Sequence, residues 1–243
     1  MPRYSYTYKL LNRQLGKALN QYSMIEDGDR IALGLSGGKD SWALLWLLRE
    51  LRRRAPIEFK LFPIYIDPGF QGGPGPMIAD HAKRSGFDVH IEHTEDGLIA
   101  HSDQNRENPC FLCSRMRRKR LFEIADALQC KKLALAHNKD DVIETLFLNI
   151  CYGGEISTMV PLQPFFGGKL NIIRPLAYAD EDILERFSRE MRWPVQQNPC
   201  PSAGNSKRAE IKALLRKLYH SNHKIKGNIF RAMRHVKSEY LLK

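Results

Sequence analysis

Short apolar runs alternate with helical patterns along most of this chain. Between the runs, apolar side chains recur at the three- and four-residue spacing of amphipathic helices. This alternation is typical of an α/β protein whose parallel sheet is covered by helices on both faces. We therefore expect a doubly wound, mainly parallel five-stranded sheet. The predicted strands lie near residues 30–35, 59–66, 87–92, 131–136 and 171–174, and the predicted helices near 41–54, 75–85, 114–128, 139–151 and 180–191.

Further helical patterns flank this alternating part of the chain. An apolar stripe that includes Leu11 and Leu15 predicts an N-terminal helix over residues 7–23. Two more patterns, over residues 206–220 and 225–241, predict a basic helical extension at the other end. The expected organisation has three parts: an N-terminal helical segment, an α/β domain with an inserted loop that carries a cysteine pair, and a C-terminal extension. Their predicted bounds are 1–28, 29–193 and 194–243.

A glycine-containing loop joins the first predicted strand to the helix that follows it. Its sequence is Ser36-Gly37-Gly38-Lys39-Asp40-Ser41. Small residues at a strand end let backbone N–H groups converge on an anion, and the N-terminus of the helix adds partial positive charge. Small residues are also favoured in ordinary surface turns, which is the alternative interpretation. The loop lacks the spacing of a Walker loop and resembles that of the PP-loop ATPases, which bind the pyrophosphate of ATP and form an adenylate.

Five cysteines raise the question of metal or redox chemistry. Cys110 and Cys113 form a C-x-x-C pair, and the basic run from Arg115 to Arg120 behind it is expected to lower the pKa of the thiols. Cys200, in a proline-flanked loop, is the obvious third ligand, whereas Cys130 and Cys151 are expected in the core. The pair could also form a redox disulfide or have no function. Three thiolates without a recognisable fourth ligand suit an iron–sulfur cluster with one open iron better than structural zinc.

The charge balance points to a polyanionic partner. The 243 residues include 38 Lys and Arg against 27 Asp and Glu, a formal net charge of +11. Counterion release favours nucleic acid as the partner of such a protein, although a solvated surface or anionic lipid is compatible with the same charge. No apolar segment has the character of a signal peptide or the length of a membrane span, so we expect a cytoplasmic protein with reduced thiols and no membrane partner.

Several segments together resemble the TtcA-type tRNA 2-thiocytidine synthetases, which are ATP-dependent tRNA sulfurtransferases of the PP-loop, adenine nucleotide alpha hydrolase-like, type. The resemblance extends from about residue 9 to residue 215. Two positions depart from the family pattern: Ala136 begins a motif that usually reads G-H-H, and Ala203 stands where a further cysteine is often found. The segments that carry the resemblance are 24–30, 36–41, 110–118, 137–149, Arg174-Pro175-Leu176 and the placement of Cys200 after Trp193-Pro194.

The resemblance implies a set of site residues. Cys110, Cys113 and Cys200 would hold a [4Fe-4S] cluster, and Asp40 would orient Mg²⁺. Arg117 would stabilise a charged intermediate or contact RNA phosphate, whereas a solvated helix face is its alternative role. Asp140 and Glu144 are weighed evenly between a site role and capping of a helix. The expected residues around ATP are Ser36, Gly37, Gly38, Lys39, Asp40, Ser41, Asp67, His137 and Asp141.

The implied reaction adenylates the C2 oxygen of a tRNA cytidine and replaces this oxygen with sulfur. The expected cytidine is that at position 32, in the anticodon loop. The sulfur donor would be a cysteine desulfurase or free sulfide. The expected oligomeric state is a homodimer. Three alternatives stay open at this point. They are thiolation of another tRNA base, a PP-loop ligase that attaches an amine to RNA, and a zinc-stabilised nucleotide- or RNA-binding protein without catalysis.

Overall fold

The computed structural model describes residues 5–195, 199–202, 204 and 206–242. These residues form two compact units. The first comprises residues 1–138 and 160–203, and the second comprises residues 139–159 and 204–243. Within the described residues, no helix is long and apolar enough to cross a membrane. The boundaries that the sequence suggests, at 28/29 and 193/194, stay a prediction.

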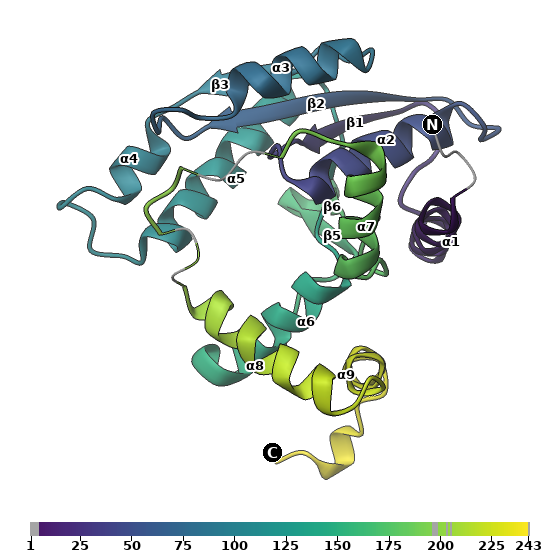
Figure 1. Cartoon of the computed structure of the whole chain (residues 1–243), viewed down its shortest axis with the longest axis vertical. Helices are drawn as coiled ribbons and strands as arrows, with labels where there is room; N and C mark the ends of the chain where they lie inside the picture. Colours follow the sequence, from purple (N-terminus) through teal and green to yellow (C-terminus); the bar gives the residue numbers. More distant parts are fainter. Residues whose placement is uncertain (1–4, 196–198, 203, 205, 243) are drawn as a thin grey trace. The chain divides into compact units, whose positions relative to one another are not determined.

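The first unit is built on a six-stranded sheet in the order β3-β2-β1-β4-β6-β5 (Figure 1). Neighbouring strands are parallel except for β5, which pairs with β6 in the antiparallel direction. The mainly parallel α/β fold is thereby confirmed, and β5 adds a sixth strand at the edge. The strands are β1 Asp29–Gly34, β2 Phe59–Asp67, β3 His90–His93, β4 Lys132–Ala134, β5 Leu162–Phe165 and β6 Leu170–Ile173.

Helices of the first unit cover both faces of this sheet. Successive residues of a strand point to opposite faces, and Ile31, Ala32 and Leu33 of β1 are all fully buried. Ala32 packs with Leu121 of α5 on one face. The helices of this unit are α1 Tyr6–Gln21, α2 Lys39–Arg52, α3 Gly75–Arg84, α4 Asp96–Ala100, α5 Pro109–Ala127 and α7 Glu181–Met191, with a single 3-10 turn over Phe166–Gly168.

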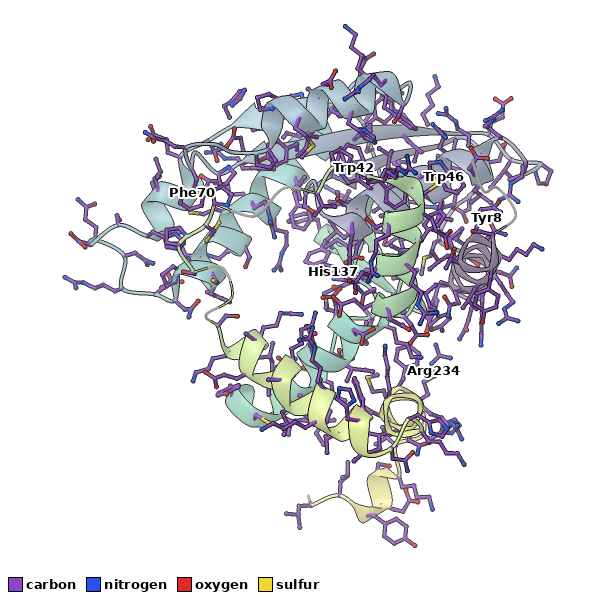
Figure 2. The ribbon with its side chains drawn as sticks, in the orientation of Figure 1. Tyr8, Trp42, Trp46, Phe70, His137 and Arg234 are labelled. Atoms are coloured by element: carbon purple, nitrogen blue, oxygen red, sulfur yellow. The ribbon has the colours of Figure 1, made fainter. Side chains whose placement is uncertain are left out.

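A row of aromatic side chains ties together α1, α2 and α7. Tyr8 meets Trp46 edge to face with ring centroids 5.4 Å apart, and Trp46 meets Phe187 in the same way at 5.3 Å. Figure 2 shows Tyr8 and Trp46 pointing toward one another from α1 and α2. Edge-to-face contacts of this kind add to the stabilisation from buried apolar area. They fix the helix that follows the glycine-containing loop.

The second unit is helical and has a small core of its own. Ile143, Ile211 and Leu215 are buried in it, from α6 and α8. The last predicted helix, over residues 225–241, is shorter in the structure, where α9 ends at Ala232 and a 3-10 turn follows. The elements of this unit are α6 Lys139–Leu148, a π-helical turn over Asn149–Gly153, α8 Lys207–Ser221, α9 Ile225–Ala232 and the 3-10 turn Ser238–Tyr240.

Candidate active site

The loop between β1 and α2 is wound tightly around the start of α2. Gly38 is the N-cap of this helix, and Gly37 adopts a left-handed conformation with φ at +77°. A Cβ atom on Gly37 would lie 2.8 Å from Cδ1 of Ile78, on α3. Glycine is therefore required at position 37 for its backbone conformation, and its lack of a side chain lets α3 approach closely. The strand–loop–helix placement predicted for residues 36–41 is present.

The two serines of the loop hold its backbone in shape. The Ser41 hydroxyl donates to the carbonyl oxygen of Gly38 at 2.9 Å, and the backbone N–H of Ser36 donates to the same hydroxyl oxygen at 3.2 Å. The Gly38 N–H lies 3.3 Å from the Ser36 hydroxyl. These hydrogen bonds hold the loop in shape at the N-terminus of α2, and a helix N-terminus is a favourable place for a phosphate.

Lys39 and Asp40 carry the charges at the start of α2. Lys39 Nζ lies 3.1 Å from a carboxylate oxygen of Glu181 and 3.4 Å from one of Asp40. Burial opposes the charge on Lys39, but the Asp40 and Glu181 carboxylates outweigh it and raise the pKa of the lysine. The Asn138 side-chain amide donates to Asp40 at 3.3 Å. Asn138 and Glu181 are site residues that the sequence analysis missed.

Asp67 ends β2, the strand next to β1 in the sheet. Its Oδ1 accepts the Gly69 N–H at 3.0 Å, and Nδ1 of His93 lies 3.4 Å from Oδ2. Burial raises the pKa of neighbouring Tyr65 to about 12, with Asp67 adding to the shift and Arg117 opposing it. Arg117 therefore lies near the end of β2. Because parallel strands present their carboxyl ends at one edge, Asp67 shares an edge of the sheet with the glycine-containing loop.

His137 follows β4 and is held by a buried arginine. Arg174, which is 5% exposed, places Nε 3.3 Å from Nδ1 of His137. The same guanidinium donates to the carbonyl oxygen of Val160 at 2.6 Å and to the side-chain oxygen of Gln163 at 3.1 Å. Burial lowers the pKa of Arg174 to about 10. A buried cation with neutral partners is costly, so Arg174 marks a position suited to an anionic ligand. Arg174 belongs to a segment that carries the family resemblance, and only the structure adds it to the candidate site.

The cysteine pair lies on helix α5. The prediction that an inserted loop carries this pair is therefore wrong. Asn108 caps α5 by accepting the backbone N–H groups of Cys110 and Phe111, and Pro109 is its first residue. Cys110 is exposed and Cys113 is half-buried. Because the pair is three residues apart on this helix, both thiols lie on one side of its first turns.

The expected lowering of the thiol pKa is wrong for Cys113. Burial raises the pKa of this thiol, and the nearby charge of Arg117 opposes burial without outweighing it. Cys200 and Cys110 also raise the pKa of Cys113, which shows that the three thiols are close enough to interact electrostatically. The structure therefore brings together Cys110, Cys113, Cys200 and Arg117, and their roles stay a prediction.

The chemistry of the donor set fits an iron–sulfur cluster. Among the described residues, no group of three Cys, His, Asp or Glu side chains is placed to hold one metal ion. The donors are all sulfur, which is the ligand that iron–sulfur clusters take.

The remaining two cysteines differ from one another. Cys130 is buried at 4% exposure, as predicted, and burial raises the pKa of its thiol to about 11. Cys151 is exposed on the π-helical turn, so its predicted core position is wrong. The apolar pattern of residues 139–151 continues past the end of α6, where the chain leaves the regular helix and exposes these side chains.

Asp141 and its acidic neighbours lie in the second unit. Arg208 Nη1 lies 3.4 Å from a carboxylate oxygen of Asp141 and 3.1 Å from one of Glu144. Lys226 Nζ lies 2.7 Å from Asp140. Glu144 is buried, which raises the pKa of its carboxyl group against the influence of Lys212 and Arg208. These ion pairs favour a structural role for Asp140 and Glu144, and the assignment of Asp141 to the nucleotide site stays a prediction.

The glycine-containing loop at the carboxyl edge of a parallel sheet defines a PP-loop protein. The family model described as "PP-loop domain" matches residues 7–218. A U34-tRNA thiolase, NcsA from Methanococcus maripaludis with its [4Fe-4S] cluster, superposes with a TM-score of 0.79 at 25% identity. The match covers 97% of this chain and 80% of that one. An NH3-dependent NAD synthetase from Campylobacter jejuni, at 14% identity and a TM-score of 0.53, shares the fold alone.

Curated relatives narrow the class further. A tRNA-cytidine(32) 2-sulfurtransferase from Geotalea daltonii is 40% identical over 239 residues, which cover 97% of this chain and 94% of the relative. The enzyme of the same name from Geobacter sulfurreducens is 38% identical, with 97% and 93% covered. This chain belongs to the family of the tRNA-cytidine(32) 2-sulfurtransferases.

Proposed function

We propose that this protein replaces the C2 oxygen of cytidine 32 in tRNA with sulfur, in a reaction that consumes ATP. The observation that carries the proposal is the presence, in one compact unit, of a phosphate-binding loop and three interacting thiols. Each half of this arrangement suits one half of the reaction. The names of the relatives supply the substrate, tRNA, and the position of the base.

The loop residues would bind the pyrophosphate part of ATP. Ser36, Gly37, Gly38, Lys39 and Ser41 surround the N-terminus of α2, where backbone N–H groups and the helix dipole favour negative charge. Asp40 would orient Mg²⁺ directly or through water. Asp67 ends β2 and His137 follows β4, the two strands that flank β1 in the sheet, and both side chains would face the adenosine. The assignment of Asp141 to the nucleotide site is kept as a prediction from the sequence.

The chemical difficulty is that the C2 oxygen of a cytosine is a poor leaving group. Bound ATP would supply an adenylyl group to this oxygen, and a bound [4Fe-4S] cluster would supply the sulfur. Cys110, Cys113 and Cys200 are the residues that would hold the cluster. Arg117, beside Cys113 and the end of β2, would neutralise charge that develops on the reacting base or bind an RNA phosphate.

The proposal includes the surroundings of the reaction. We infer that the sulfur comes from a cysteine desulfurase or from free sulfide. We also infer that the protein works in the cytoplasm, where thiols stay reduced and tRNA is present. A homodimer is a further expectation. Size-exclusion chromatography with light scattering tests the assembly, and transfer of ³⁵S from a desulfurase or from sulfide tests the donor.

A reconstituted reaction tests the function. Protein purified without oxygen is expected to be brown. When it is supplied with ATP, Mg²⁺ and sulfide, it is expected to convert cytidine 32 of a tRNA transcript to 2-thiocytidine, with AMP and pyrophosphate formed in equal amounts. Mass spectrometry of the nucleosides and analysis of the nucleotides measure both. A transcript with uridine at position 32 is the matched control. Formation of ADP and phosphate would overturn the adenylation step, and thiolation of another base would overturn the substrate.

Two further outcomes separate the remaining alternatives from the proposed function. The similarity to a U34-tRNA thiolase makes thiolation of another base the nearest alternative. Colourless protein with one zinc per chain would favour a binding protein without catalysis. Metal-free protein that attaches an amine to RNA would favour a ligase.

A further inference from the structure

His101, at the end of α4, makes contacts that the proposed reaction does not explain. It is the C-cap residue of α4, and its ring packs edge to face on Phe70, with centroids 5.5 Å apart. Nδ1 lies 2.8 Å from the carbonyl oxygen of Gly97. Nε2 lies 2.8 Å from the Ser202 hydroxyl and 3.6 Å from Sγ of Cys200. Figure 2 labels Phe70 in the region of α4.

The hydrogen bonds of His101 define what each ring nitrogen does. A carbonyl oxygen only accepts, so Nδ1 carries the hydrogen that it donates to Gly97. In the neutral ring, Nε2 is then an acceptor, and it takes the hydrogen of the Ser202 hydroxyl. Cys200 Sγ lies against the same nitrogen. The imidazole is fixed on one side by its own helix and holds the cysteine-bearing loop on the other.

The loop that carries Cys200 joins α7 to α8. No helix or strand is present among the described residues between the end of α7 at Met191 and the start of α8 at Lys207. His101 lies about a hundred positions earlier in the chain, so its contacts with Cys200 and Ser202 close a long loop. Ordering such a segment is costly in conformational entropy, and contacts that order it in advance lower the cost of binding a ligand there.

The contacts with His101 hold Cys200 near the cysteine pair on α5. Cys200 raises the pKa of Cys113, so the two thiols lie within electrostatic reach of one another. Asp96, the first residue of α4, acts on the same thiol. The helix that anchors His101 is therefore adjacent to the cysteine pair on α5. One histidine connects the third thiol to the framework that carries the other two.

We propose that His101 is a positioning residue that sets Cys200 beside Cys110 and Cys113, so that three thiolates can hold the cluster together. This rests on the proposed function, because it assumes that these thiols are the cluster ligands. Side chains that orient a metal ligand typically change metal affinity about 10- to 100-fold when they are removed. His101 is expected to act in that range.

The first experiment measures cluster retention in His101→Ala and His101→Gln. Loss of iron to a chelator is expected to be about tenfold faster in His101→Ala than in the wild type. His101→Gln, whose side-chain oxygen can still accept from Ser202, is expected to lie between the two. His90→Ala, an exposed histidine on β3, is the matched control and is expected to match the wild type. Thermal melting of the metal-free proteins shows whether each variant is folded.

A second experiment needs no metal. Dibromobimane links thiols that lie a few ångströms apart, and peptide mass spectrometry identifies the linked pair. In metal-free protein, the yield of links from Cys200 to Cys110 or Cys113, relative to labelling of Cys200 by iodoacetamide, is expected to fall several-fold in His101→Ala. Ser202→Ala is expected to cause a smaller fall.

The outcomes separate this inference from the proposed function. If wild-type protein holds a cluster and His101→Ala retains iron and forms the bimane link equally well, the role of His101 is wrong and the proposed function stands. If the wild type holds no cluster but the link depends on His101, the histidine positions Cys200 and the proposed function fails. If neither cluster nor dependence is found, both fail.

Discussion

The glycine-containing loop, residues 36–41, lies in the same unit as Cys110, Cys113 and Cys200. The loop and this set of cysteines are built in opposite ways. Every residue of the loop comes from one segment, 36–41, and its internal hydrogen bonds join residues no more than five positions apart. The cysteines come from α5 and from a loop almost ninety positions later. The glycine-containing loop is shaped by contacts within its own segment, whereas the placement of the thiols depends on contacts between distant segments, such as that of Cys200 with His101.

Replacing Cys200 is the strongest test of the set of cysteines, whose placement depends on distant contacts. Cys200→Ser is expected to lower the iron content and the formation of 2-thiocytidine by more than ~100-fold, because a missing ligand costs more than a missing outer partner. ATP binding should be unchanged, since the loop is built separately. Iron analysis, nucleoside mass spectrometry and calorimetry measure the three quantities. Cys151→Ser, at an exposed cysteine, is the control. Retained thiolation in Cys200→Ser would remove Cys200 from the site.

Replacing Gly37 tests the locally built half. Gly37→Ala places a Cβ in the left-handed region and against Ile78, and a strain of roughly 1–2 kcal/mol is expected to weaken ATP binding by about 5- to 30-fold. The iron content should stay at the wild-type value. Calorimetry with ATP and Mg²⁺ measures the change.

Gly16→Ala provides the matched control for this variant. A Cβ on Gly16, in α1, meets nothing within 4 Å. The substitution is expected to leave ATP binding unchanged and to stabilise the protein by about 1 kcal/mol through helix propensity. Equal ATP affinity in Gly37→Ala and Gly16→Ala would show that the loop does not bind the nucleotide.

Replacing arginines of α5 tests whether the helix that carries the cysteine pair also binds RNA. Arg117→Gln and Arg118→Gln are each expected to weaken tRNA binding several-fold and to lower the slope of log affinity against log salt by about 1. The reason is that each phosphate contact releases counterions. Filter binding between low and moderate salt measures the slope. Arg189→Gln on α7, where the arginine pairs with Glu185, should leave the slope unchanged. A wild-type affinity that does not respond to salt would contradict the electrostatic part of the proposal.

Cys130 provides the smallest test, because it is a buried thiol outside the site. Its pKa in the folded protein, about 11, lies above the ordinary value of 9.0, so the folded state holds the proton more tightly. The stability from this group is complete below pH 9 and is lost as the pH rises toward 11. The free energy of unfolding is measured from pH 7.5 to pH 10.5 in the wild type and in Cys130→Ala. Its fall over this range is expected to be smaller in Cys130→Ala, by on the order of 1 kcal/mol. Parallel curves for the two proteins would contradict this.

The fold was predictable where elements are long or repeat a clear pattern. The five parallel strands and the helices beginning near 7, 41, 75, 139 and 180 follow directly from apolar periodicity. β5 was missed because it contains Pro164, which is acceptable only because β5 is an edge strand. α4 has five residues, too few to show a helical period. The start of α5 could have been found, since Asn108 and Pro109 are a favoured N-cap and first residue.

The site divides along the same line. From the sequence alone, residues 36–41, the three cysteines and Asp67 are predicted as site residues, because they stand beside strand ends or in segments of the family resemblance. Arg174, Asn138 and His101 become candidates only through the structure. Each has a partner between 37 and 99 positions away, and nothing in the local sequence signals such a pairing.

The sequence by itself determined the α/β class, the phosphate loop and the identity of the thiols, because strand periodicity, turn chemistry and side-chain chemistry are local properties. The tertiary structure alone decided the electrostatics of those groups. Burial raised the pKa of Cys113 against the basic run beside it, and it left Arg174 among neutral partners beside His137. Desolvation depends on everything that packs around a group, and this comes from segments that only the folded chain brings together.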